Sequence, residues 1–282
     1  MSDQMAGRTI VITGASDGLG AAAAKRLSRS GENVVVVGRS PQKTAAVAAG
    51  IGADHFVTDF ADLAQVKELA HALLARYPRI DVLANNAGGM MAGERQVTVD
   101  GHEKTFQVNH LAPFLLTSLL LDRLIESGAR VVNTSSIGNK LFSKFDIDDL
   151  ESERGYRAQT AYGNAKLANV LFTRELHHRY HEAGISTAAL HPGGVASNFG
   201  SESTSRLMKL MYHTPLKNLA LITPEQGSDL LVWLACATPG EDWTSGEYYS
   251  GHSMAKAHQR AYDPELAREL WDRSAAMVGV EA

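Results

Sequence analysis

The chain has 282 residues, of which 44% are hydrophobic and 21% are charged. This balance excludes a disordered chain or a fibre and is typical of a globular protein. Its 27 Lys and Arg residues against 31 Asp and Glu give a formal net charge of -4, so no overall positive field exists to attract nucleic acid or anionic lipid.

The single cysteine, Cys236, excludes an internal disulfide and a zinc site built on several cysteines. No apolar run reaches the roughly 18 residues that a membrane span needs, and the first residues lack the apolar core of a signal peptide. We therefore expect a cytoplasmic protein with no nucleic-acid or membrane partner. Because no repeat or linker divides the sequence, we expect one domain over residues 1–282.

Short apolar runs rich in β-branched residues alternate with longer Ala- and Leu-rich segments. The short runs predict strands of a buried parallel sheet at 9–13, 33–37, 55–57, 82–84, 131–133 and 186–190. The longer segments predict helices near 18–30, 41–50, 61–76, 102–126 and 160–183. This alternation predicts an α/β fold, a single Rossmann-type doubly wound parallel sheet of roughly seven strands with helices on both faces. Its ligand site is expected beyond the carboxyl ends of the strands.

The first predicted strand leads into a glycine-rich turn and then into an Ala-rich helix. Glycines allow a tight bend, and the free N–H groups and dipole at a helix start favour a pyrophosphate. The spacing is Gly-x-x-x-Gly-x-Gly, which differs from the Gly-x-Gly-x-x-Gly fingerprint. Its place between strand and helix nevertheless predicts a dinucleotide site, with contacts from Gly14, Ser16, Asp17, Gly18, Leu19 and Gly20.

The residues after the second strand indicate which dinucleotide binds. Gly38 occupies the position at which a carboxylate would repel a 2′-phosphate. The next residue is Arg39, and its guanidinium can pair with that phosphate. We therefore predict NADP(H), held by Arg39 and Ser40. Asp17 lies in the glycine turn where a basic residue would have strengthened this preference, so NAD(H) stays open as a second cofactor.

Tyr162 and Lys166 are four residues apart in the predicted helix 160–183, so they share one helix face. A nearby cation favours the phenolate and moves the pKa of a tyrosine from about 10 toward the range in which it can act as acid and base. Small polar residues follow the fourth and fifth strands, and Asn109 lies in the helix between them. Strand ends of this kind converge on one cleft.

With these motifs in order along residues 8 to about 250, the chain resembles the short-chain dehydrogenase/reductase superfamily. The resemblance implies that Tyr162 is the general acid and base, that Lys166 holds the nicotinamide ribose and tunes Tyr162, and that Asn109 holds a relay water. It also implies that Ser136, the later of two adjacent serines, orients the carbonyl. The further cofactor contacts that it implies are Asp59, Phe60, Asn86, Ala87, Gly88, Tyr162, Lys166, Pro192, Gly193, Val195 and Ser197.

Tyr162 follows Ser136 by 26 positions, about twice the separation in many members of the superfamily. The extra segment, residues 139–159, resembles the retinol-dehydrogenase-like branch. The segment 198–222 is expected to form a substrate lid, and its methionines together with Met90, Met91, Leu141 and Phe142 indicate a bulky apolar substrate. The resemblance also implies a homodimer or homotetramer that pairs through the helices at 102–126 and 160–183, unless the insertion blocks that pairing.

These features predict an NADPH-dependent reductase that converts a ketone or aldehyde into an alcohol, or catalyses the reverse. One alternative is a carbon–carbon double-bond reductase, because protochlorophyllide reductases share Tyr-x-x-x-Lys, although they also use cysteines near the site. Another is a non-catalytic NADP sensor, against which the intact set of Asn109, Ser136, Tyr162 and Lys166 argues. No metal site is predicted, because the histidines at 177, 178 and 181 lack a further ligand nearby.

Overall fold

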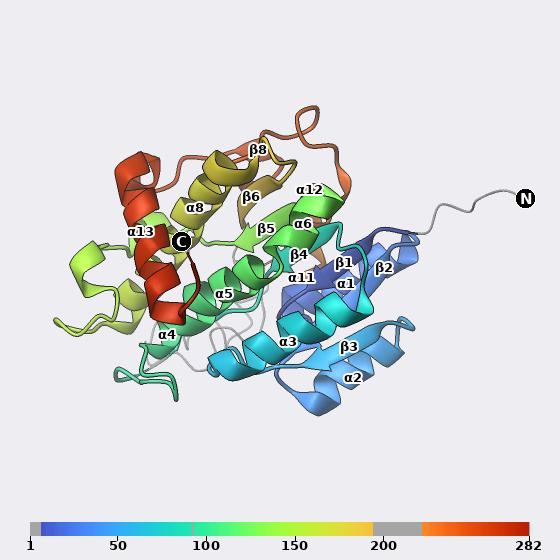
Figure 1. Cartoon of the computed structure of the whole chain (residues 1–282), viewed down its shortest axis with the longest axis horizontal. Coiled ribbons are helices and arrows are strands. Elements are labelled where there is room, and N and C mark those ends of the chain that lie inside the picture. Colours follow the sequence, from blue (N-terminus) through green and yellow to red (C-terminus); the bar gives the residue numbers. More distant parts are fainter. Residues whose placement is uncertain (1–6, 92, 194–221, 282) are drawn as a thin grey trace, which may run out of the picture.

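The computed structural model describes residues 7–91, 93–193 and 222–281. Its centre is a sheet of eight strands in the order β3-β2-β1-β4-β5-β6-β7-β8 (Figure 1). The first seven strands run parallel, and β8 is antiparallel to β7. The strands are β1 (Thr9–Ile12), β2 (Asn33–Gly38), β3 (Asp54–Val57), β4 (Val82–Asn85), β5 (Arg130–Thr134), β6 (Ser186–His191), β7 (Glu247–Ser250) and β8 (Ser253–Met254).

The predicted doubly wound sheet is confirmed, with its order reversing between β1 and β4. The sheet has eight strands where roughly seven were predicted, and the six ranges predicted from the sequence include neither β7 nor β8. The chain leaves β7 through Gly251, whose φ of 59° permits a tight hairpin turn, and the two residues of β8 then pair back against β7. Such a short exposed strand has no apolar run by which the sequence could reveal it.

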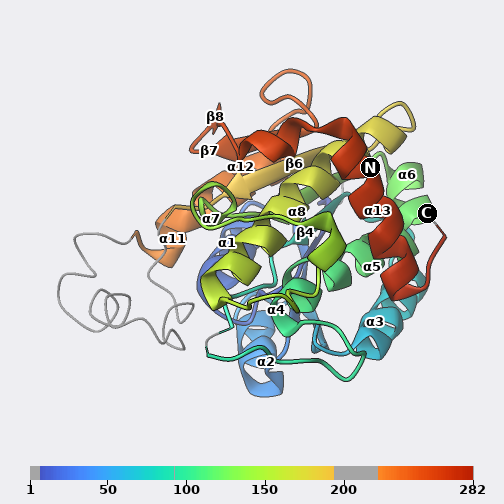
Figure 2. The ribbon, with the colours of Figure 1, turned by 90° about the vertical axis from the view of Figure 1, so that its left-hand side faces the viewer.

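Helices cover both faces of the sheet (Figures 1 and 2). One face carries α1 (Gly18–Arg29), α2 (Pro41–Ala49), α11 (Pro224–Gly227) and α12 (Asp229–Cys236). The other carries α3 (Leu63–Arg76), α4 (Lys104–Phe106), α5 (Ala112–Leu119), α6 (Leu121–Ser127), α8 (Ala158–Tyr180) and α13 (Pro264–Val278). Because side chains alternate along a strand, Ile10 and Ile12 pack in one layer of the core and Val11 in the other.

The prediction of a single helix at 102–126 is wrong, because this part of the chain forms several shorter helical segments. α4 leads into a π-helical turn, Gln107–Leu111, then α5, and a bend of 64° separates Lys104–Leu119 from Leu121–Ser127. Pro113 lacks an N–H and so cannot bond to the carbonyl of Asn109 four residues earlier, which accounts for the irregular turn. No single helix among the described residues meets the length and hydropathy of a membrane span, and the two segments around the bend do so only together.

The C-terminal helix α13 crosses the outer side of α5 and α8 (Figures 1 and 2). The ring of Trp271 lies 4.9 Å from that of Phe114 and 5.7 Å from that of Phe172. The guanidinium of Arg179 lies over the Trp271 ring, 4.7 Å from its centre. The helices through which the sequence predicts pairing between subunits are therefore covered in part by a helix of the same chain.

The insertion at 139–159 is short and irregular, with the end of α7 (Gly138–Leu141) and a 3-10 turn at Ile147–Asp149. It is tied to the C-terminal part of the chain, since Asn139 Oδ1 accepts a hydrogen bond from His258 N at 2.9 Å and Asp148 pairs with Arg273 at 2.7 Å. The insertion and the C-terminal region therefore pack as one layer beside α8.

Candidate active site

The glycine turn after β1 lies in backbone contact with the end of β4. A Cβ atom on Gly14, whose φ is 66°, would lie 2.7 Å from the Cα of Ala87, and one on Gly20 would overlap the Gly14 carbonyl oxygen. Thr13 Oγ1 accepts hydrogen bonds from the N–H groups of Asn86 and Ala87, each at 3.0 Å. Only glycine fits these two positions, so the turn closes onto the sheet at its carboxyl edge.

The start of α1 offers unpaired donors to an anion. The carboxylate of Asp17 caps the helix by accepting from Gly18 N at 2.7 Å. The N–H groups of Leu19 and Gly20 have no hydrogen-bond acceptor among the described residues. Two donors at the positive end of a 12-residue helix therefore fit the pyrophosphate of a dinucleotide.

The end of β2 lies against the same turn. A Cβ atom on Gly38 would be 2.7 Å from the Cβ of Ser16. The Arg39 side chain that follows is exposed, and within the described ranges it forms no ion pair or hydrogen bond. Lys43 Nζ lies 2.8 Å from Asp17 Oδ2, a pair that the sequence did not indicate. The negative charge of Asp17 is thus offset, while Arg39 keeps its charge for a ligand.

Ser40, Asp59 and Phe60 are ordered by local contacts. Ser40 caps α2, and its Oγ accepts from Lys43 N at 3.4 Å. Asp59, beyond β3, accepts from Ala61 N at 3.0 Å, and the buried Phe60 uses its carbonyl to accept from Gln107 Nε2 at 3.3 Å. All three lie at the carboxyl edge of the sheet, and their contacts with a cofactor stay predictions.

The two adjacent serines after β5 have different surroundings. Ser135 is buried, and its hydroxyl donates to the carbonyl of Lys166 at 2.7 Å. Ser136 is half-buried, and its Oγ accepts from Gly138 N at 3.1 Å. A Cβ atom on Gly138 would lie 3.1 Å from Cε1 of Tyr162. Ser136 and Tyr162 therefore flank the same glycine, whereas Ser135 fastens the strand to α8.

Tyr162 and Lys166 lie on one face of α8, as their spacing predicts. Lys166 Nζ is 5.6 Å from the centre of the Tyr162 ring and donates to the carbonyl of Thr134 at 3.0 Å. Lys166 is only 2% exposed, and burial lowers its pKa to about 7. A buried cation beside the phenol favours the phenolate, because little water screens the attraction between the two charges.

Asn109 lies in the π-helical turn and is fully buried. Its Nδ2 donates to the carbonyls of Gly89 and Thr105, each at 2.8 Å, and its Oδ1 accepts from Gly89 N at 3.0 Å. The side chain is thus occupied in holding the loop after β4. Its backbone carbonyl accepts from Nδ2 of Asn169 at 2.9 Å. The sequence assigned no role to Asn169, which ends the motif Lys166-Leu-Ala-Asn and lies one turn after Lys166 on the same side of α8.

The loop after β6 begins beside the serine pair. His191 Nδ1 accepts from Ile137 N at 3.3 Å, and burial lowers the pKa of His191, which keeps the ring a neutral acceptor. Pro192 and Gly193 follow, and the φ of 88° at Gly193 suits glycine. The predicted contacts Val195 and Ser197, and all of the predicted lid 198–222 except its last residue, lie outside the described residues.

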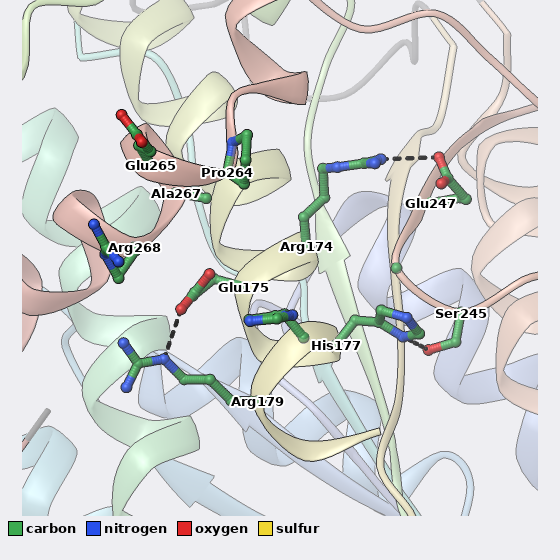
Figure 3. A pocket seen from close by; sticks show the side chains of 12 residues that line it. Arg174, Glu175, His177, Arg179, Ser245, Glu247, Pro264, Glu265, Ala267 and Arg268 are labelled. Atoms are coloured by element: carbon green, nitrogen blue, oxygen red, sulfur yellow. Dashed lines mark hydrogen bonds and ion pairs between the residues drawn. The ribbon is translucent and has the colours of Figure 1, made fainter. Parts of the chain in front are cut away.

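A cavity of about 630 Å³ lies along the C-terminal half of α8, two turns or more from Lys166 (Figure 3). Its charges face one another: Arg174 pairs with Glu247 at 3.0 Å and Arg179 with Glu175 at 2.7 Å. His177 shares a hydrogen bond of 2.9 Å with Ser245. Within the described parts of the chain, no group of three side chains could hold a metal ion. This cavity lies apart from the face of α8 that carries Tyr162 and Lys166.

Comparison with known proteins agrees with this geometry. The family model described as short chain dehydrogenase matches residues 8–207. A protein of Streptomyces sp. (strain C5), provisionally named daunorubicin C-13 ketoreductase, is 43% identical over 280 residues, which span 97% of this chain and 93% of that protein. Human retinol dehydrogenase 13 is 37% identical, over 98% of this chain and 86% of its own. A short chain dehydrogenase structure from Shigella flexneri in complex with NADP is 26% identical, with a TM-score of 0.62 over 83% of this chain and 93% of that one.

Proposed function

The chain belongs to the short-chain dehydrogenase family, and on that premise we propose that it reduces a bulky, largely apolar ketone with NADPH. The coarser class, an oxidoreductase that uses NAD(P) to interconvert a carbonyl and an alcohol, follows from the family itself. The observation that carries the proposal is the meeting of Ser136, Tyr162 and Lys166 at the carboxyl edge of β5, with Gly138 between the first two.

The three side chains have distinct roles in this reaction. NADPH, which the glycine turn and Arg39 would hold, would supply the hydride for the carbonyl carbon. Tyr162 donates its proton to the carbonyl oxygen, which completes the alcohol and leaves a phenolate that Lys166 stabilises until solvent returns the proton. Because Ser136 Oγ accepts from Gly138 N, its own hydrogen is directed elsewhere and can bond to the substrate oxygen, where negative charge develops.

The preference for NADPH rests on Arg39. Its exposed guanidinium follows β2 beside the glycine turn, and Lys43 offsets the carboxylate of Asp17 that would repel a 2′-phosphate. We expect Arg39→Ala to lower kcat/KM with NADPH at least tenfold and to leave kcat/KM with NADH within about twofold, since only NADPH carries that phosphate. An equal loss with both cofactors would refute the assignment.

The proposed substrate class rests on apolar side chains next to Ser136. Ile137, Leu141 and Phe142 are 40%, 63% and 37% exposed, and they follow Ser136 directly into α7. Exposed apolar groups gathered beside polar catalytic groups favour a ligand with a large apolar surface. The names of the two relatives agree with this class, because both daunorubicin and retinol carry extended ring or polyene systems.

The double-bond reductase finds less support. Cys236 is the only cysteine in the sequence. Its backbone carbonyl accepts a hydrogen bond from the side chain of Arg8, the residue just before β1. It therefore lies at the amino edge of the sheet, opposite the edge that holds Tyr162. A cysteine at that edge cannot reach a substrate beside Ser136.

The decisive experiment follows NADPH consumption with aromatic polyketide ketones, retinal, steroid ketones and quinones, and identifies each product by mass spectrometry. We expect an alcohol product, and a loss of about 10²–10⁴ in kcat for Tyr162→Phe. Tyr180→Phe, on the same helix, is the matched control and should keep full activity. Tight NADPH binding without turnover of any compound would overturn the proposal in favour of a cofactor sensor.

A further inference from the structure

A line of buried hydrogen bonds leads from the C-terminal helix to the active-site lysine. Ser274 Oγ lies 2.9 Å from His110 Nε2, and His110 Nδ1 lies 3.2 Å from Asn169 Oδ1. Asn169 Nδ2 donates at 3.2 Å to the carbonyl of Thr134, and that oxygen also accepts from Lys166 Nζ at 3.0 Å. The side chains of Ser274, His110, Asn169 and Lys166 belong to residues no more than 3% exposed.

The donors and acceptors in this line can be assigned in one way. Asn169 Nδ2 points at two carbonyl oxygens, those of Thr134 and Asn109, so its Oδ1 is the acceptor. His110 Nδ1 must then carry the hydrogen. Burial lowers the pKa of His110 to about 4, so its ring is neutral and Nε2 accepts from the hydroxyl of Ser274.

The two carbonyls that Asn169 serves lack ordinary backbone partners. In a regular helix the carbonyl of Asn109 would bond to the N–H of residue 113, but that residue is proline. The carbonyl of Thr134 lies past the end of the β4–β5 ladder, whose last pair is Asn85 with Asn133. A buried carbonyl without a donor costs free energy, and its segment is then held less firmly. Because the amide of Asn169 bonds to the carbonyls of both Asn109 and Thr134, it fixes both segments.

We propose that Asn169 is a positioning residue, oriented by His110 and Ser274, that holds the Thr134 carbonyl and through it keeps Lys166 beside Tyr162. This inference rests on the proposed function for its meaning, because it assigns Lys166 the task of stabilising the Tyr162 phenolate. It makes α13 part of the support of the active site, through the hydrogen bond between Ser274 and His110.

The test measures the pKa of the Tyr162 phenol by NMR of protein labelled with carbon-13 at the tyrosine ring, with Tyr162→Phe to assign the signal. In Asn169→Leu and in His110→Leu the ammonium of Lys166 loses its fixed place, so we expect the phenol pKa to rise by at least half a unit. The pH profile of kcat/KM should move the same way. His110→Asn keeps a donor toward Asn169 and should restore most of the original value.

A matched control separates positioning from stability. Thr117→Val removes another buried hydroxyl, which accepts from Asn85 and lies on α5. It should lower the melting temperature without moving the phenol pKa. If Asn169→Leu and His110→Leu likewise lower only the melting temperature, the inference is overturned. Because the phenol pKa is read without substrate, a rise in that pKa alongside a failure to find any reduced ketone would refute the proposed function and leave this inference standing.

Discussion

Lys166 Nζ lies 5.6 Å from the centre of the Tyr162 ring. Within the described chain no carboxylate pairs with that ammonium, and its hydrogen bond goes to a backbone carbonyl. The protein therefore keeps a cation at a buried place where the charge is opposed by desolvation and not compensated by an acid. This buried charge should therefore lower the stability of the folded protein at neutral pH.

Replacing this lysine should stabilise the fold while it abolishes turnover. The pKa of Lys166 is lowered from 10.5 to about 7, which corresponds to about 4 kcal/mol at neutral pH. Allowing for the lost hydrogen bond, Lys166→Met should gain about 2 kcal/mol and raise the melting temperature by about 5 °C. Differential scanning calorimetry at pH 7 checks this, with Lys67→Met on α3 as an exposed control that should leave the melting temperature nearly unchanged. A lower melting temperature for Lys166→Met would contradict the account.

Acid should destabilise the protein through His110. The pKa of His110 is lowered from 6.5 to about 4, so the unfolded chain binds an extra proton between these values and stability falls as the pH drops through that window. The loss amounts to about 3 kcal/mol. Urea unfolding between pH 7 and 4 measures it. The slope should shrink in His110→Asn and persist in the control His55→Asn, whose parent side chain is exposed.

The contact between α7 and α8 depends on Gly163, the residue that follows Tyr162. A Cβ atom on Gly163 would lie 2.6 Å from Ser143 N and 2.7 Å from the carbonyl carbon of Phe142. Gly163→Ala must push α7 away, so we expect a loss of about 1–3 kcal/mol in stability and a clear fall in kcat. Gly50→Ala adds a methyl group no closer than 3.4 Å to any neighbour, at φ -66°, and is the matched control. Equal behaviour of the two variants would refute the packing argument.

Because α13 packs over part of α5 and α8, we predict that the protein is a monomer. Trp271 occupies the face that a second copy would need for pairing through these helices. Size-exclusion chromatography with light scattering should therefore give a mass near 30.3 kDa at micromolar concentrations. A dimer or tetramer would show that another face pairs. A dimer lost on substitution of residues exposed on α5 would show that α13 leaves enough of the original face free.

Local patterns in the sequence were enough for the sheet and for most of the candidate site. Six of the strands follow from short apolar runs, since a buried parallel strand needs apolar side chains on both faces, although β3 lies at the edge of the sheet and is largely exposed. The shared face of Tyr162 and Lys166 follows from helical spacing. The apolar pattern at 102–126 is continuous and therefore predicted one continuous helix. Pro113, within that range, has no N–H to donate, and the helix is irregular there.

Other features depend on residues that are distant in the sequence and meet only in the folded chain. His110 reaches Asn169 across 59 positions and Ser274 across 164, and no spacing rule connects them. The same holds for Asp17 with Lys43, which are 26 positions apart. The sequence by itself determined the alternating fold and, through the resemblance that its ordered motifs carry, the reaction class, because those motifs are local patterns of residues. The tertiary structure decided how the lysine is held, because hydrogen bonds between distant segments form only when the core packs.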